Sequence, residues 1–179
     1  MFIWRARFRR LQVQKLLGSR VVARRWKQNA PDYWSIYVAR RDSGIDSVDD
    51  CLGKVVAFED PHSTSGFLLP AGTLVDRGFQ ILEVSRPQEP VAPDEIGYFF
   101  THEEENTFEL MFRGEVAGGA VSNQDFLEFT NLDNELKAQL MAVDHTVSVP
   151  LEFLSVRADL DAEITATIVD LLGNMPAKA

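Results

Sequence analysis

Apolar residues occur in short blocks along the chain, and their spacing predicts a series of strands. Tyr33–Ala39 is rich in aromatic and β-branched residues, which favour a strand. Lys54–Phe58 is a short apolar run of the kind found in buried parallel strands. Further strands are predicted at 79–84, 116–121, 141–149 and 153–156.

Helical patterns lie between most of these strands, at 11–28, 63–77, 101–113, 124–140 and 160–172. Gly78 is placed to end the helix at 63–77. Gly114 is placed to end the helix at 101–113, for which Thr101 is a good N-cap. Ser47 and Asp50 have the spacing of a capping box for a short turn. We expect Pro70 to kink its helix if it lies beyond the first turn. Strands alternating with helices predict an α/β fold with a mostly parallel sheet flanked by helices.

Composition excludes several classes of protein. The 179 residues suit one domain, and no apolar run approaches the roughly 20 residues that cross a bilayer. The single cysteine, Cys51, cannot form an internal disulfide, and no Cys/His spacing indicates a metal site. We therefore expect neither a metal nor another cofactor. The first residues do not have the pattern of a secretory signal, because no apolar stretch follows the basic ones.

Charge is unevenly distributed along the chain. Residues 1–27 hold nine of the 18 basic residues and no acid, so the remainder has 9 basic and 27 acidic residues, a formal charge of −18. Nucleic-acid binding could rest only on Arg5, Arg7, Arg9 and Arg10, and we expect none. An acidic body still permits an anionic ligand, because local backbone dipoles decide binding at short range.

The segment Asp60–Gly66 has the chemistry of an oxyanion site. It lies between a predicted strand and a predicted helix, where the first helical N–H groups have no partner within the helix. Ser63, Thr64 and Ser65 add hydroxyl donors, and Gly66 permits close approach. A bare N-cap cluster with no ligand remains an alternative. The segment has neither the Walker spacing nor the G-x-S-x-G motif of serine hydrolases.

The run from Asp60 to Pro70, D-P-H-S-T-S-G-F-L-L-P, closely resembles a segment of the phosphonate- and phosphite-binding proteins of bacterial ABC importers. Other motifs agree in the same order, namely Tyr33-Trp34-Ser35 with Arg41-Asp42-Ser43, Leu52–Phe58, Arg113–Val121 and Val156–Leu160. The resemblance covers roughly residues 20–175. It implies a type 2 periplasmic-binding fold, a periplasmic or extracellular location, and an ABC permease as partner.

The resemblance also implies roles for individual residues. Ser63, Thr64 and Ser65 bind the phosphoryl oxygens, Tyr33 supplies a phenol donor, and His102 supplies an imidazole N–H. Without the resemblance, His102 would be interpreted as an ordinary surface residue at the start of a helix.

Two positions differ from the family pattern. Glu152 stands where the family usually has an aspartate, and its carboxylate could accept a hydrogen bond from a protonated ligand oxygen. Gln124, beside Asp125, is neutral where aminophosphonate receptors carry an acid. Phosphate, phosphite and simple alkylphosphonates are therefore the expected ligands, and Gln124 and Asp125 are possible neighbours of the site.

The resemblance implies a chain in which the first lobe is largely missing. Residues 1–30 are expected to be a basic remnant of that lobe, 31–156 the ligand-binding lobe, and 157–179 a C-terminal helix returning towards the first lobe. Half of a cleft should bind weakly, and its exposed apolar surface could favour a homodimer.

Three functional hypotheses follow. The first is a solute-binding protein, or its second lobe, for a phosphonate-like anion. The second is a receptor-like sensor or interaction domain with no role in transport. The third is a hydrolase that uses Ser63 or Ser65 with His62, His102 or His145. No spacing pairs a base with a nucleophile, so we do not expect an enzyme.

Overall fold

The computed structural model describes residues 18–175 except 28 and 133. The chain divides into two compact units, one formed by 1–32 with 150–179 and the other by 33–149. Each unit is described by itself. The strands β2 (Asp32–Tyr33) and β9 (Val149–Pro150) contain the two boundaries.

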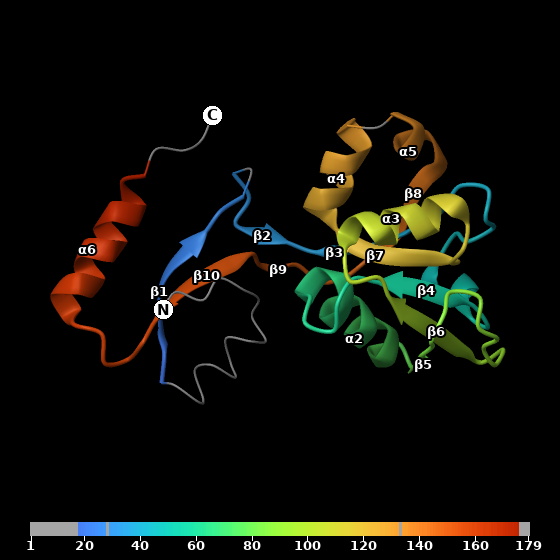
Figure 1. Cartoon of the computed structure of the whole chain (residues 1–179), viewed down its shortest axis with the longest axis horizontal. Coiled ribbons are helices and arrows are strands. Elements are labelled where there is room, and N and C mark those ends of the chain that lie inside the picture. Colours follow the sequence, from blue (N-terminus) through green and yellow to red (C-terminus); the bar gives the residue numbers. More distant parts are fainter. Residues whose placement is uncertain (1–17, 28, 133, 176–179) are drawn as a thin grey trace. The chain divides into compact units, whose positions relative to one another are not determined.

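A six-stranded sheet forms the centre of the larger unit (Figure 1). Its strand order is β5-β6-β4-β7-β3-β8. The neighbours β5, β6, β4 and β7 are parallel, whereas β3 is antiparallel to both β7 and β8. The prediction of a mostly parallel sheet is confirmed. The strand bounds are β3 Ser35–Arg40, β4 Val55–Phe58, β5 Gln80–Glu83, β6 Glu95–Phe100, β7 Gly118–Ser122 and β8 Leu140–His145.

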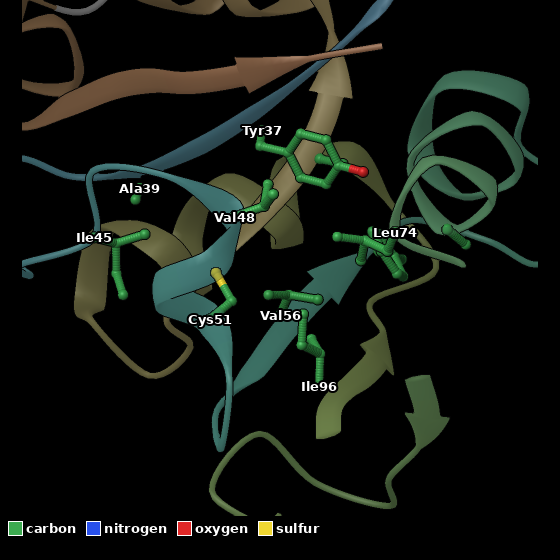
Figure 2. Close-up of a cluster of buried hydrophobic side chains, with 11 residues drawn as sticks. Tyr37, Ala39, Ile45, Val48, Cys51, Val56, Leu74 and Ile96 are labelled. Carbon is green, nitrogen blue, oxygen red and sulfur yellow. The ribbon is translucent and has the colours of Figure 1, made fainter. Parts of the chain in front are cut away.

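Helices cover both faces of this sheet because side chains of its central strands alternate between two apolar clusters. In β4, Val56 and Phe58 pack with Leu74 of α2, whereas Val55 and Ala57 pack with Met111 of α3. Figure 2 shows the first cluster, where Val56 lies near Leu74 and the short helix η1. The helix bounds are η1 Val48–Cys51, α2 Leu69–Asp76, α3 Glu104–Arg113, α4 Asn123–Leu132 and α5 Asn134–Gln139.

The smaller unit contains an antiparallel pair of strands and one helix. Strand β1 (Arg20–Arg25) pairs with β10 (Glu152–Val156), and α6 spans Ala162–Gly173. The Arg20 guanidinium donates to Thr165 Oγ1 at 3.0 Å, which ties β1 to α6. A two-stranded ribbon has little stability alone, so this helix contact matters to the unit.

Local signals predicted many element ends correctly. Gly78 and Gly114 both have positive φ angles after their helices, and Asp50 accepts from the Ser47 N–H at 2.9 Å as a capping box requires. The Thr101 prediction was wrong, because Glu103 is the N-cap of α3. The Thr101 hydroxyl instead contacts Phe58 O and the buried Thr107 hydroxyl.

Three further expectations need correction. The helix predicted for 11–28 is wrong at Arg20–Arg25, because this segment pairs with β10 and that pairing overrides the local pattern; residues 11–17 lie outside the described part. No strand was predicted at Glu95–Phe100, yet β6 lies between β5 and β4. The single helix predicted for 124–140 is two helices, α4 and α5.

Candidate oxyanion site

The predicted site lies where β4 ends and a helix begins. A helical segment starts with η2 (Thr64–Leu68) and continues directly into α2, so it spans Thr64 to Asp76. Ser63 is its N-cap, and the Ser63 hydroxyl accepts from the Gly66 N–H at 2.9 Å. The preceding turn is closed by the Asp60 carboxylate, which accepts from the His62 N–H at 2.8 Å. The sequence signal for this helix start is therefore confirmed.

The first turn is a π-helix, with N–H groups bonded to the carbonyl five residues earlier. The Leu68 N–H donates to Ser63 O at 2.9 Å, and the Leu69 N–H donates to Thr64 O. The next bond in this series would need an N–H from Pro70, which proline lacks. Pro70 therefore cannot donate to Ser65 O, the next carbonyl of the π-series.

Donors from β3 and from the residue after β4 bond to the carbonyls of this turn. The buried Ser35 hydroxyl of β3 donates to Ser65 O at 2.7 Å, and the Glu59 N–H donates to Gly66 O at 3.1 Å. The Tyr37 hydroxyl, two residues along β3, donates to Pro70 O at 2.6 Å. Burial raises the pKa of Tyr37, which keeps the phenol protonated as a donor. These bonds hold the start of the helix against the sheet.

Gly66 is required by close packing at this turn. A Cβ built on Gly66 would lie 2.6 Å from Glu59 Cβ and 2.9 Å from Ser63 Oγ. Both distances are shorter than real side-chain contacts. The glycine therefore permits the strand, the loop and the helix to approach each other.

The Thr64 side chain is the clearest sign of a ligand. Thr64 is 8% exposed, and its Oγ1 atom is buried with no hydrogen-bond partner among the described residues. Leaving a buried hydroxyl unpaired costs about 1–3 kcal/mol. It stands at a helix N-terminus, where unpaired N–H groups also favour an anion. The arrangement suits a ligand with several acceptor oxygens.

Three loops meet at this edge of the sheet because β6, β4 and β7 are parallel neighbours. After β6, the His102 N–H donates to Glu59 O at 2.7 Å, which joins the first two loops. His102 is exposed and has a φ of 66°, unusual for a residue other than glycine. After β7, α4 begins with Asn123, Gln124 and Asp125. His102, Gln124 and Ser63–Ser65 are thus at the same edge.

The other predicted residues lie in different surroundings. Tyr33 is half-buried at the start of the larger unit, just before β3. The Asp125 N–H donates to Ser122 Oγ at 3.0 Å, so Asp125 takes part in the first turn of α4. Glu152 belongs to the smaller unit, where its carboxylate accepts from Arg25 at 3.0 Å.

Two hollows lie on the larger unit, and the first is bordered by His145, a candidate base in the hydrolase hypothesis. One of about 690 Å³ is bordered by Trp34, Ile36 and 142–148, and another of about 520 Å³ lies beside Arg40, Lys54 and Glu115. Neither borders Ser63–Gly66. Within the described residues, no cluster of potential metal ligands was found, and no helix is long and apolar enough to span a membrane.

A family model matches almost the whole chain. The family model described as "ABC transporter, phosphonate, periplasmic substrate-binding protein" matches residues 3–179. The chain belongs to this phosphonate-binding family. The resemblance in Asp60–Pro70 and the other motifs is therefore confirmed, and so is the expected type 2 periplasmic-binding fold.

Individual relatives of the chain match it over different lengths. The phosphate-import protein PhnD of Mycolicibacterium smegmatis is 48% identical over 50 residues, which cover 27% of this chain and 16% of that protein. XAC2383 from Xanthomonas citri, solved bound to ATP, has a TM-score of 0.86 at 22% identity. The match covers 96% of this chain and 62% of the XAC2383 chain.

A third relative is PhnD1 from Prochlorococcus marinus, solved in complex with methylphosphonate. It has a TM-score of 0.72 at 18% identity, and the match covers 97% of this chain and 64% of the PhnD1 chain. At these identities the two solved structures establish the fold alone. The chain spans less than two thirds of the length of each of these relatives.

Sequence reasoning missed two contributors to this edge. Ser35 was part of a matched motif, but no role followed from it, because its partner Ser65 O is 30 residues away in the chain. The buried state of the Gln124 amide was likewise not visible in the sequence. The pairing of β3 with β7 makes Ser35 and Ser122 register partners, and this pairing is not visible in the sequence.

Proposed function

We propose that this chain is the solute-binding component, or the second lobe of one, of an ABC importer for a phosphorus oxyanion. The ligand is a phosphonate, phosphite or phosphate bound at the start of η2. The buried, unpartnered hydroxyl of Thr64 at this helix N-terminus is the observation that carries the proposal. A tetrahedral oxyanion would pair that hydroxyl and the free N–H groups together.

Each predicted residue has a role in this proposal. Ser63, Thr64 and Ser65 hold the phosphoryl oxygens through hydroxyl and backbone donors. Tyr33 and His102 add a phenol and an imidazole donor. Glu152 keeps the role that the family resemblance implies, as acceptor for a protonated ligand oxygen. A carboxylate acceptor selects against sulfate, since a fully ionised oxyanion leaves it unpaired.

The ligands of relatives support the phosphoryl class. They are phosphate for the mycobacterial import protein, methylphosphonate for PhnD1 and ATP for XAC2383. All three present tetrahedral phosphorus with several acceptor oxygens. The proposal places the chain in the periplasm, or on the outer face of the membrane, with a permease as its partner and no catalytic step or nucleic-acid contact.

A homodimer is part of the proposal, through apolar surface of the smaller unit. Trp26 is 60% exposed, Ile164 52% and Leu171 63%. Large exposed apolar side chains of this kind favour association. Analytical ultracentrifugation should detect a dimer that weakens in Leu171→Glu and persists in Ala166→Glu, an exposed control on the opposite side of α6 from Ile164 and Leu171. A monomer at all concentrations would contradict the homodimer and leave the proposed oxyanion binding untouched.

Calorimetry with phosphite, methylphosphonate, phosphate, ATP and sulfate tests the main proposal. We expect heat of binding with at least one of the first three and a much weaker signal with sulfate. ATP alone as ligand would indicate nucleotide recognition instead. Failure of every phosphorus compound to bind a well-folded sample would contradict the proposed function.

A further inference from the structure

The backbone of His102 has an unusual conformation in the loop between β6 and α3. Its φ angle is 66°, in the left-handed region that residues other than glycine rarely adopt. Such a conformation persists only where the surrounding structure enforces it. His102 is exposed, so packing of its side chain does not supply the constraint. The constraint therefore comes from the backbone on either side of it.

The peptide unit that precedes His102 is hydrogen bonded at both of its polar atoms. Its N–H belongs to His102 and donates to Glu59 O at 2.7 Å. Its carbonyl belongs to Thr101 and accepts from Asn106 Nδ2 at 3.1 Å. Because a peptide unit is planar, these two bonds fix its orientation. The angle φ of His102 is rotation out of that plane, so Asn106 helps to set the direction in which the chain continues.

A pair of buried threonines holds the chain on the other side of His102. Thr101 is 6% exposed and Thr107 is fully buried, and their hydroxyls lie 2.6 Å apart. The carbonyl of Glu103 is 3.0 Å from the Thr101 hydroxyl and also accepts from the Thr107 N–H at 3.3 Å. The residues before and after His102 are thus both anchored to the first turns of α3.

Glu59 joins this loop to the start of η2. Its carbonyl accepts from the His102 N–H, and its own N–H donates to Gly66 O at 3.1 Å. One residue therefore bonds to the loop after β6 on one side and to the first turn of η2 on the other. The backbone of His102 consequently keeps a fixed position relative to the proposed oxyanion site.

We propose that Asn106 is a positioning residue for oxyanion binding, which acts through His102 by fixing the peptide unit between Thr101 and His102. Asn106 is itself exposed, so its side chain contributes little packing to α3. Its bond to Thr101 O sets the direction of His102 before a ligand arrives. This inference rests on the proposed function, since His102 must donate to the phosphoryl group.

A double-mutant cycle tests the inference, with methylphosphonate as the probe in calorimetry. His102→Ala should weaken binding about tenfold or more, because a bond to a charged group is lost. Asn106→Ala should weaken it about 3- to 10-fold while the melting temperature changes little. In the His102→Ala background, Asn106→Ala should have no further effect, because the imidazole on which it acts is gone. Equal losses from Asn106→Ala in both backgrounds would show a structural role and overturn the inference.

Glycine at position 102 tests whether the loop enforces the left-handed conformation. His102→Gly and His102→Ala both remove the imidazole and should lose affinity alike. The glycine variant should melt about 2–4 °C higher than the alanine variant, because glycine adopts this φ at little cost. Equal melting temperatures would contradict the constraint from which the role of Asn106 is inferred.

Asn174→Ala is the matched control for Asn106→Ala. Asn174 is exposed, and its Nδ2 donates to Asp170 O at 2.9 Å in α6 of the smaller unit. The variant removes the same kind of bond and should keep the affinity for methylphosphonate. A loss in Asn174→Ala equal to that in Asn106→Ala would show a general effect on the fold and would contradict the inference.

Binding by the unchanged chain distinguishes failure of the inference from failure of the proposed function. If methylphosphonate binds and substitution of Asn106 or of His102 changes nothing, the inference fails while oxyanion binding at η2 stands. If methylphosphonate, phosphite and phosphate all fail to bind the folded chain, the proposed function fails with it.

Discussion

At the scale of single residues, a substitution of Thr64 should weaken ligand binding without lowering the stability of the fold. Its hydroxyl has no partner among the described residues, so Thr64→Val should leave the melting temperature unchanged or slightly raised. Affinity for methylphosphonate should fall about 10- to 100-fold, because a hydrogen bond to a charged group is lost. Calorimetry and thermal denaturation check both results. Thr73→Val, whose hydroxyl bonds to Leu69 O further along the same helical segment, should keep the affinity.

Gly66 gives a second prediction at this scale. Gly66→Ala should destabilise the protein and weaken oxyanion binding, because the new Cβ would meet Glu59 at 2.6 Å. Gly72→Ala, on the exposed side of α2 with nothing within 4 Å, should instead stabilise by about 0.5–1 kcal/mol. Chemical denaturation of the two variants checks the contrast. Equal effects on stability would contradict the close packing inferred at Gly66.

At the scale of elements, the bond between β3 and η2 keeps the π-turn in place. Ser35→Ala leaves the buried Ser65 carbonyl without a donor, so it should cost about 1–3 kcal/mol and weaken oxyanion binding. Thr167→Ala removes an exposed bond to Glu163 O and should cost under about 0.5 kcal/mol. Denaturant titration and calorimetry provide the measurements. Unchanged binding in Ser35→Ala would mean that the turn keeps its shape without this bond.

An ion pair between α2 and β8 gives a pH-dependent prediction. Arg77 bonds to both oxygens of Asp144 and holds the pKa of that carboxyl below its ordinary value. This contribution to stability is present above pH about 3.9, the unfolded value, and is lost as pH falls through the lower folded pKa. Asp144→Asn should therefore cost about 1 kcal/mol at neutral pH and progressively less in acid.

Stability curves from pH 7 to pH 2, relative to the unchanged protein, check this prediction. The exposed pair Arg157–Asp159 supplies the control, and Asp159→Asn should change stability little at any pH. A deficit in Asp144→Asn that stays constant down to pH 2 would show that the ion pair is not its cause.

Elements also show how far the sequence predicts this fold. The strand at Val55–Phe58, the helix after Ser63 and its end at Gly78 follow from local signals, namely an apolar run, a cap and a glycine. The strand at Arg20–Arg25 does not, because only pairing with β10 selects it. The π-turn depends on Pro70 together with Ser35, a partner remote in the sequence.

At the scale of the whole molecule, the parallel order of β6, β4 and β7 places three loops at one edge of the sheet. The motif in Asp60–Pro70 predicted the central loop between a strand and a helix, and the oxyanion chemistry assigned to that loop stays a prediction. The roles of Tyr33, His102 and Glu152 came only from the family resemblance and stay predictions. Burial of the Thr64 and Gln124 donors follows from the assembled sheet, which no single segment reveals.

The most direct test of an oxyanion site at η2 is a titration of the ¹⁵N-labelled chain followed by amide NMR. Adding methylphosphonate should shift the amides of Ser63 to Gly66 in a saturable way. Gly72, later in the same helical segment, should show little change, and sulfate should produce a much smaller response. Saturable shifts centred elsewhere, or no shifts in a folded sample with methylphosphonate, phosphite or phosphate, would contradict the account.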